Sequence, residues 1–155
     1  VMRVVLIRKF GSWSMKVSGL TEAQKSSKLE ETERGGEIML QFIEYPKCST
    51  CRKAKAELTQ LGLDFEAVDI VQNTPSRDQL LDWIQNSDFE IKAFFNTSGL
   101  KYRELGLKEK VPHLSAQEAA DLLSTDGMLI KRPLLVRDNQ ILQIGYRKAY
   151  EELEL

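Results

Sequence analysis

The only two cysteines of this 155-residue chain, Cys48 and Cys51, are three positions apart. Two thiols at this spacing can form a disulfide within one helical turn, and the first can act as a thiolate at a helix N-terminus. A strand-like run, residues 39–44, precedes the pair, and a helix-like run, residues 53–61, follows it. The sulfhydryl chemistry of the chain is therefore predicted at one strand-to-helix junction, which is typical of a thiol–disulfide protein.

The two cysteines are expected to have different roles. Cys48 is the predicted nucleophile, because a helix N-terminus and the charges of Lys47, Arg52 and Lys53 all favour its thiolate. The alternative for Cys48 is a buried, inert thiol. Cys51 would resolve an intermediate on Cys48 and leave a disulfide between them. The alternative for Cys51 is a small apolar side chain packed on the helix face.

Two hydroxyl residues and one histidine complete the chemistry that the sequence offers. Ser49 and Thr50 open the helix, where their backbone N–H groups and a hydroxyl could bind an oxyanion, although such residues are also ordinary in a first turn. Zinc takes four ligands, and the chain offers two cysteines and the lone His113, so a site would need a carboxylate as well; that alternative is disfavoured, and no metal is predicted. His113 is expected to lie in a loop or at the surface.

Composition excludes several classes of partner. Apolar residues make up 42% of the chain, charged residues 29%, and the net charge is −1. No overall field therefore points to nucleic acid or an anionic membrane, and neither is an expected partner. No apolar run approaches the roughly 20 residues of a membrane-spanning helix. We expect a cytoplasmic protein, and in a reducing compartment a close cysteine pair is more often catalytic than structural.

The chain divides into two parts by composition. Residues 1–36 are predicted to be a flexible N-terminal extension, because residues 18–36 are polar and charged and end in two glycines. Residues 37–155 are predicted to form the compact domain. There, a strand over 39–43, the helix after the cysteines and a strand over 65–70 make a βαβ unit, for which a right-handed crossover is expected.

Helices fill the middle of the compact domain and strands return at its end. The predicted elements are a helix capped by Thr74 and Pro75, short helical turns at 91–95 and 102–105, a helix from the capping box Ser115–Glu118, a hairpin of strands 134–136 and 141–144, and a last helix over 147–153. The order predicts an α/β protein with a thioredoxin-like fold and a helical insertion between its β-α-β and β-β-α parts.

Four segments in order resemble a known family. They are Tyr45-Pro46-Lys47-Cys48-Ser49-Thr50-Cys51-Arg52-Lys53-Ala54, then Phe94-Phe95-Asn96-Thr97-Ser98-Gly99 with residues 102–107, then Met128-Leu129-Ile130-Lys131-Arg132-Pro133-Leu134, and Gln143-Ile144-Gly145-Tyr146-Arg147. Together they resemble the ArsC/Spx family of arsenate reductase-related proteins. The resemblance covers residues 39–155, which is essentially the whole predicted compact domain.

The resemblance implies a set of site residues. Arsenate reductases of this family use an N-terminal cysteine as nucleophile and arginines to hold the oxyanion. Arg132 and Arg147 match such arginines, and Pro133 matches a cis-proline that faces the cysteine loop. A third family arginine lies near Asn96, where this chain has no cation, so weaker binding of arsenate is expected. The family implies no bound cofactor, with glutathione and glutaredoxin, or thioredoxin, as reductant.

The resemblance leaves two functions open. The first is a thiol-dependent oxidoreductase that acts on a small oxyanion or a disulfide, with Cys48 as nucleophile, Cys51 as resolving thiol and Arg132 as an oxyanion contact. The second is a redox-switched transcriptional regulator of the Spx type, which binds the C-terminal domain of the RNA polymerase α subunit. The segment 143–146 also occurs in Spx-type members, whereas residues 87–97 lack the glycine of their polymerase-binding stretch.

Overall fold

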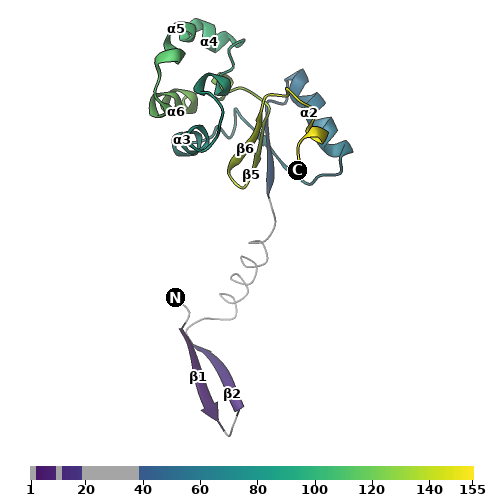
Figure 1. Ribbon diagram of the computed structural model, residues 1–155, viewed down its shortest axis with the longest axis vertical. Helices are drawn as coiled ribbons and strands as arrows, with labels where there is room; N and C mark the ends of the chain where they lie inside the picture. Colours follow the sequence, from purple (N-terminus) through teal and green to yellow (C-terminus); the bar gives the residue numbers. More distant parts are fainter. Residues whose placement is uncertain (1–2, 10–11, 19–38) are drawn as a thin grey trace. The chain divides into compact units, whose positions relative to one another are not determined.

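The computed structural model describes residues 3–9, 12–18 and 39–155, in two units, Val1–Glu37 and Ile38–Leu155 (Figure 1). In the first unit, strand β1 (Arg3–Lys9) pairs with strand β2 (Ser12–Ser18) in antiparallel fashion. The predicted flexible extension, residues 1–36, includes this hairpin, which the sequence did not predict. Its other residues lie outside the described ranges, and its flexibility stays a prediction.

A four-stranded sheet organises the second unit. Its strands are β3 (Leu40–Glu44), β4 (Glu66–Asp69), β5 (Leu134–Arg137) and β6 (Gln140–Ile144), in the order β4-β3-β5-β6. Strands β3 and β4 run parallel and are joined by helix α2 (Ser49–Gln60), which confirms the predicted βαβ unit. The β3–β5 and β5–β6 pairs are antiparallel, and the second of them is the predicted hairpin.

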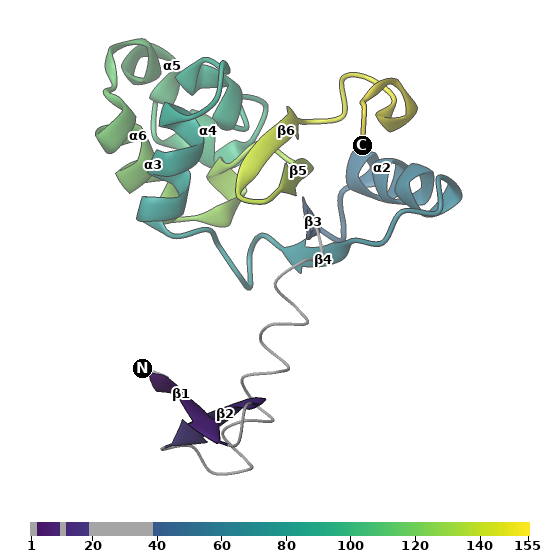
Figure 2. The ribbon, with the colours of Figure 1, turned by 60° about the horizontal axis from the view of Figure 1, so that its bottom comes forward.

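Helices cover both faces of this sheet (Figure 2). Ala54 and Leu58 of α2 pack with Phe42, Leu135 and Tyr150 in one apolar cluster. Helices α3 (Arg77–Gln85) and α6 (Ala116–Ser124) belong to the larger cluster on the opposite face. Since side chains alternate along a strand, neighbouring residues of β3 and β5 contribute to different clusters.

The chain between β4 and β5 is the predicted helical insertion. After α3 it contains η1 (Ile91–Phe94), α4 (Leu100–Glu104), α5 (Leu107–Lys110), η2 (Val111–His113), α6 and η3 (Gly127–Leu129). Ser115 and Glu118 form the predicted capping box of α6. No helix in the described part of the chain is both long and apolar enough to span a membrane. The architecture is the predicted α/β thioredoxin-like fold with a helical insertion.

Two predicted helix boundaries are wrong. The N-cap of α3 is Ser76, whose hydroxyl accepts a hydrogen bond from the Gln79 N–H, whereas the Thr74 hydroxyl donates to the carbonyl of Ile70. Pro75 therefore lies before the cap rather than at the first helical position.

The predicted last helix over residues 147–153 is reduced to one turn, η4 (Tyr150–Glu152). The Gln143 side chain accepts hydrogen bonds from the N–H groups of Arg147 and Lys148 and donates one to the Lys148 carbonyl. These backbone groups are thus satisfied in a loop, and a helix would gain little there.

Candidate active site

The loop between β3 and α2 positions the two cysteines. The Cys48 N–H donates to the Tyr45 carbonyl at 2.9 Å, which turns the chain out of the strand. Cys48 has extended dihedral angles, φ −81° and ψ 123°, and is the N-cap of α2, which starts four residues before the run expected from apolar spacing. The Cys48 thiol therefore lies at the end of a helix whose first N–H groups have no partners within the helix.

The surroundings of Cys48 stabilise its thiolate. Partial burial opposes ionisation, but the N–H and thiol of Cys51, the N–H of Thr50 and the charge of Arg132 outweigh it, so the pKa of Cys48 is lowered. Two N–H groups in the first turn of the helix, those of Thr50 and Cys51, therefore produce the predicted lowering of the Cys48 pKa by the helix N-terminus. The nearby positive charge that contributes is Arg132, from the segment before β5, rather than the basic residues flanking the cysteines.

Cys51 has the opposite environment. Its side chain is fully buried, and burial, together with the neighbouring Cys48, raises its pKa to about 12. Both cysteines are free thiols in this structure. At neutral pH, Cys51 is therefore protonated and can donate its S–H to the sulfur of Cys48.

A pocket of about 250 Å³ opens in front of Cys48. Its lining comes from four separate segments, namely Cys48 and Thr50, Asn96, Lys131 and Arg132, and Gly145, Tyr146 and Arg147. The structure thus brings together the predicted nucleophile, one predicted hydroxyl residue and both predicted arginines. Ser49, predicted beside Thr50, is exposed and is not among the lining residues.

Arg132 is the most constrained cation of this pocket. Its guanidinium carbon lies 5.0 Å from the centre of the Tyr45 ring, a cation–π distance. Its Nε and Nη1 atoms are buried and have no hydrogen-bond partner in the described part of the chain. Buried donors of this kind normally have a partner, so they favour an anion in the pocket. The peptide bond between Arg132 and Pro133 is cis, as the resemblance implies.

Sequence reasoning missed Lys131, which also lines the pocket. The Lys131 side chain packs against Gly145. A Cβ atom added to Gly145 would lie 3.3 Å from the Cε of Lys131. Gly145 has a φ of +71°, a conformation that favours glycine and leaves room for this lysine. The available signal was the position of Lys131 immediately before the predicted arginine. Lys131 thus supplies a cation to a pocket that Asn96 also lines.

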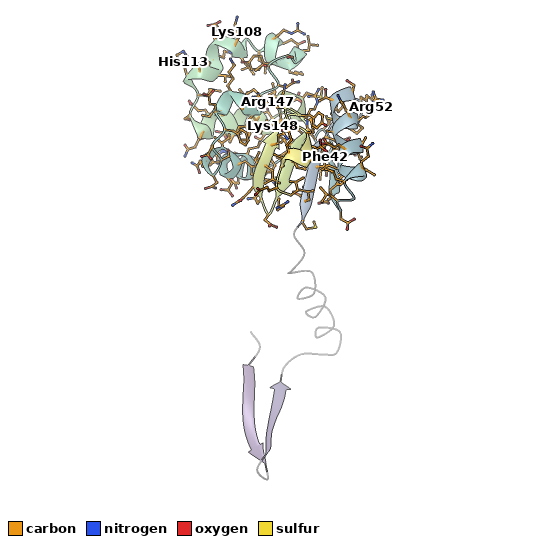
Figure 3. All side chains as sticks on the ribbon, turned by 45° about the vertical axis from the view of Figure 1, so that its right-hand side comes forward. Phe42, Arg52, Lys108, His113, Arg147 and Lys148 are labelled. Atoms are coloured by element: carbon orange, nitrogen blue, oxygen red, sulfur yellow. The ribbon has the colours of Figure 1, made fainter. Side chains whose placement is uncertain are left out.

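Two other predicted positions lie as follows. Arg147 is exposed and comes from the loop after β6, where Figure 3 labels it beside Lys148. His113 is exposed in η2, at the margin of the helical insertion and away from Arg147 in this view. The described residues contain no group of three or more His, Cys, Asp or Glu side chains placed to hold a metal ion.

Comparison with known proteins relates this site to a family. The chain matches the ArsC family over residues 43–152. It is 47% identical over 116 residues to "Uncharacterized protein YusI" of Bacillus subtilis (strain 168), across 74% of this chain and 98% of that protein. It is 30% identical over 103 residues to "Global transcriptional regulator Spx" of Streptococcus mutans serotype c, across 66% of this chain and 73% of that protein.

A solved structure is also similar. The crystal structure of "a possible arsenate reductase" from Streptococcus mutans UA159 has a TM-score of 0.74 and 59% sequence identity to this chain, covering 77% of this chain and 100% of the other. The family match and this similarity both span most of the residues of the second unit. The chain therefore belongs to the ArsC family.

Proposed function

We propose that the protein is a cytoplasmic, thiol-dependent oxidoreductase in which Cys48 is the nucleophile and Cys51 the resolving thiol. The observation that carries this proposal is the pairing of a half-buried thiol of lowered pKa with a buried thiol of raised pKa, in a pocket lined by three cations. Membership of the ArsC family supports the same class of chemistry.

With a disulfide substrate RSSR, the reaction has two steps. The Cys48 thiolate attacks one sulfur, the S–S bond breaks, and RS⁻ leaves and takes a proton from water, giving a mixed disulfide on Cys48. Cys51 then loses its proton, attacks the Cys48 sulfur and expels the second RS⁻. The two protein thiols thereby give two electrons and two protons to form two RSH.

The raised pKa of Cys51 is compatible with its role as the second attacking group. One cause of that raised pKa is the neighbouring Cys48. Once Cys48 forms a mixed disulfide it carries no charge, so this contribution disappears and the Cys51 thiol ionises more readily. The resolving step is therefore favoured only after Cys48 has reacted. Thioredoxin, or glutathione with glutaredoxin, would then reduce the Cys48–Cys51 disulfide.

An arsenic(V) oxyanion is the second substrate that this site could process. Arg132, with Arg147 and Lys131, would bind its oxygens, and Cys48 would displace one as hydroxide to form an S–As bond. Attack on the Cys48 sulfur by Cys51 or glutathione would release arsenic(III) with the bonding electron pair. Because Asn96 replaces a family arginine, we propose that disulfide exchange is faster than arsenate reduction.

The test compares wild-type protein with Cys48→Ser and Cys51→Ser variants. We expect Cys48→Ser to lose at least about a thousandfold in turnover of both substrate types, since the attacking thiolate is gone. Cys51→Ser should still form the mixed disulfide, visible as an intact-mass increase, but no internal disulfide. Full activity in Cys48→Ser would refute the proposal.

A second candidate is a redox-switched regulator that binds the C-terminal domain of the RNA polymerase α subunit. The observation that favours it is the similarity to a protein named as the transcriptional regulator Spx, combined with two cysteines one helical turn apart. A pulldown with the purified α C-terminal domain, using reduced and oxidised protein, tests it. Capture that depends on the Cys48–Cys51 disulfide would support the regulator, and equal lack of capture in both states would exclude it.

A further inference from the structure

The hydroxyl of Tyr150 is a buried polar group that the fold does not use. Tyr150 lies in η4 and is completely buried, and its hydroxyl has no hydrogen-bond partner among the described residues. A buried hydroxyl without a partner destabilises the folded state, and phenylalanine would fill the same space without that cost. Packing alone therefore gives no reason for the hydroxyl at this position.

Tyr150 packs on the helix face that carries Cys51. Helix α2 buries Cys51, Ala54 and Leu58, which are three and four residues apart and so lie on one face. Tyr150 belongs to the same apolar cluster as Ala54 and Leu58, and η4 lies beside α2 (Figure 2). Burial and, after it, the charge of Cys51 raise the pKa of Tyr150. The phenol and the buried thiol are therefore close enough to interact electrostatically.

Glu57 and Tyr146 hold η4 against α2. The Tyr146 hydroxyl donates a hydrogen bond to Glu57 Oε2, and Glu57 Oε1 accepts one from the Glu151 N–H at 3.3 Å. The rings of Tyr146 and Tyr150 meet edge to face, with their centroids 5.2 Å apart. The Tyr150 ring is thus held from two sides, by α2 and by the Tyr146 ring, and its hydroxyl stays away from solvent.

The resolving step of the proposed function places a negative charge near this hydroxyl. Cys51 must ionise to attack Cys48, and its burial opposes a charge. Of the other ionisable groups that act on Cys51, Cys48 opposes its ionisation and Arg132 favours it. The Tyr150 O–H makes no bond in the resting structure, so a bond to the thiolate would stabilise the reacting state alone. Its raised pKa keeps the phenol protonated, so it can donate a hydrogen bond but cannot remove a proton.

We infer that the Tyr150 hydroxyl donates a hydrogen bond to the Cys51 sulfur as this sulfur becomes a thiolate, and thereby accelerates the resolving step. The inference rests on the proposed function and names a further residue for its second attack. In that step Cys51 releases its proton, its sulfur bonds to the Cys48 sulfur, and RS⁻ leaves with the electron pair of the broken S–S bond and takes up a proton. Tyr150 keeps its own proton throughout, and no oxidant besides RSSR is needed.

The test separates the two attacks with a disulfide whose thiolate is coloured. Reduced protein is mixed by stopped flow with an equimolar amount of dithiobisnitrobenzoate, which releases one coloured thiolate when Cys48 attacks and another when Cys51 resolves the mixed disulfide. The variant Tyr150→Phe removes only the hydroxyl. The matched control is Tyr102→Phe, which removes the same group from a buried tyrosine of α4 that does not line the Cys48 pocket. Both releases are followed over a range of pH, and thermal melts report any loss of packing.

Tyr150→Phe should slow the second release about tenfold at neutral pH, since a hydrogen bond to a charged group is lost. Because the pKa of Cys51 would rise, the second release should also need a higher pH to reach a given rate. The first release should change less than about twofold, because the Cys48 thiolate is stabilised by the first turn of α2 and by Arg132. The melting temperature should not fall, and Tyr102→Phe should match the wild type in both releases.

Two results would overturn the inference and leave the exchange chemistry intact. One is a second release from Tyr150→Phe with the rate and pH dependence of the wild type. The other is equal slowing of both releases together with a lower melting temperature, which would assign Tyr150 a role in packing only. Absence of the first release from the wild-type protein would instead overturn the proposed function.

Discussion

The two sides of the Cys48 pocket are built in different ways. One side is the first turn of α2, where adjacent residues hold both thiols and supply the N–H groups that lower the pKa of Cys48. The other side consists of three positively charged side chains, Lys131, Arg132 and Arg147, which we call the cationic wall. They come from the two loops that flank the β5–β6 hairpin. In the proposed function, the first side would generate the nucleophile, and the second would determine which anions approach it. Changes on the two sides should therefore have separable effects.

The largest expected effect concerns the two thiols themselves. At pH 8 a thiol with a pKa of about 12, such as Cys51, is ionised to roughly one part in ten thousand. Cys48, with a lowered pKa and partial exposure, should react with iodoacetamide at least about a hundredfold faster. Its rate should fall as pH drops through its pKa and should reach a plateau at a lower pH than for an ordinary cysteine. The Cys51 rate should still rise at high pH.

Peptide mapping after brief alkylation between pH 5 and 9 measures both rates. The Cys51→Ser variant serves as the control for Cys48, because the serine hydroxyl can replace the Cys51 S–H as a donor to the Cys48 sulfur. Equal alkylation of the two thiols across this range would remove the assignment of Cys48 as nucleophile and, with it, the distinction between the two sides of the pocket.

The next effect concerns the cationic wall. Arg132→Ala should lower arsenate-reducing activity at least about tenfold, because a hydrogen bond to a charged group contributes roughly 1.5–3 kcal/mol. Formation of the Cys48–Cys51 disulfide by peroxide should remain nearly intact at pH 9, since it needs two close sulfurs and a thiolate. Arg103→Ala is the matched control, because this arginine is exposed on α4 and does not line the pocket.

If Arg132→Ala slowed both reactions equally at neutral pH, where the thiolate fraction depends on the pKa of Cys48, the role of Arg132 would be to set that pKa rather than to bind the substrate. If wild-type protein reduced arsenate efficiently and the variant did so equally well, the oxyanion site would be assigned to the wrong residues. Measuring the alkylation profile of the variant separates these outcomes, since only the first shifts the pKa of Cys48.

The contrast between the two sides also explains what the sequence could predict. The position of the thiols depends on neighbouring residues, so helix-end chemistry was sufficient to predict them at a helix N-terminus, although apolar spacing predicted a helix that begins four residues later than α2. The hairpin turn at Asp138 and Asn139, both with positive φ, is equally local. The loop after β6 is different, because the Gln143 side chain satisfies its backbone and replaces the predicted helix. Such a contact has no periodic signal in the sequence.

Prediction from the sequence was also limited because the pocket combines segments that lie far apart along the chain. Arg132 and Arg147 entered the prediction only through resemblance to the family, since neither has a distinctive local pattern. Lys131 was missed because its role depends on the space above Gly145, which becomes visible only when the two loops are adjacent. A neighbouring cavity of about 370 Å³ likewise combines residues between α3 and α4 with Lys131 and Arg147 of these loops. Physical proximity of this kind follows from topology and not from spacing along the chain.

The smallest expected effect tests whether the positive charge of Lys131 compensates for the lack of one at Asn96. Lys131→Gln should raise the KM for arsenate about threefold and change kcat less than about twofold, because a half-exposed lysine contributes a modest, uniform attraction to the anion. Lys131→Arg should restore the wild-type KM, since the charge rather than the shape is required. A structural role in packing over Gly145 would instead lower the melting temperature in both variants and leave the KM unchanged. Steady-state kinetics with thermal melts of the two variants distinguishes these results, and a KM unaffected by Lys131→Gln would limit the cationic wall to its two arginines.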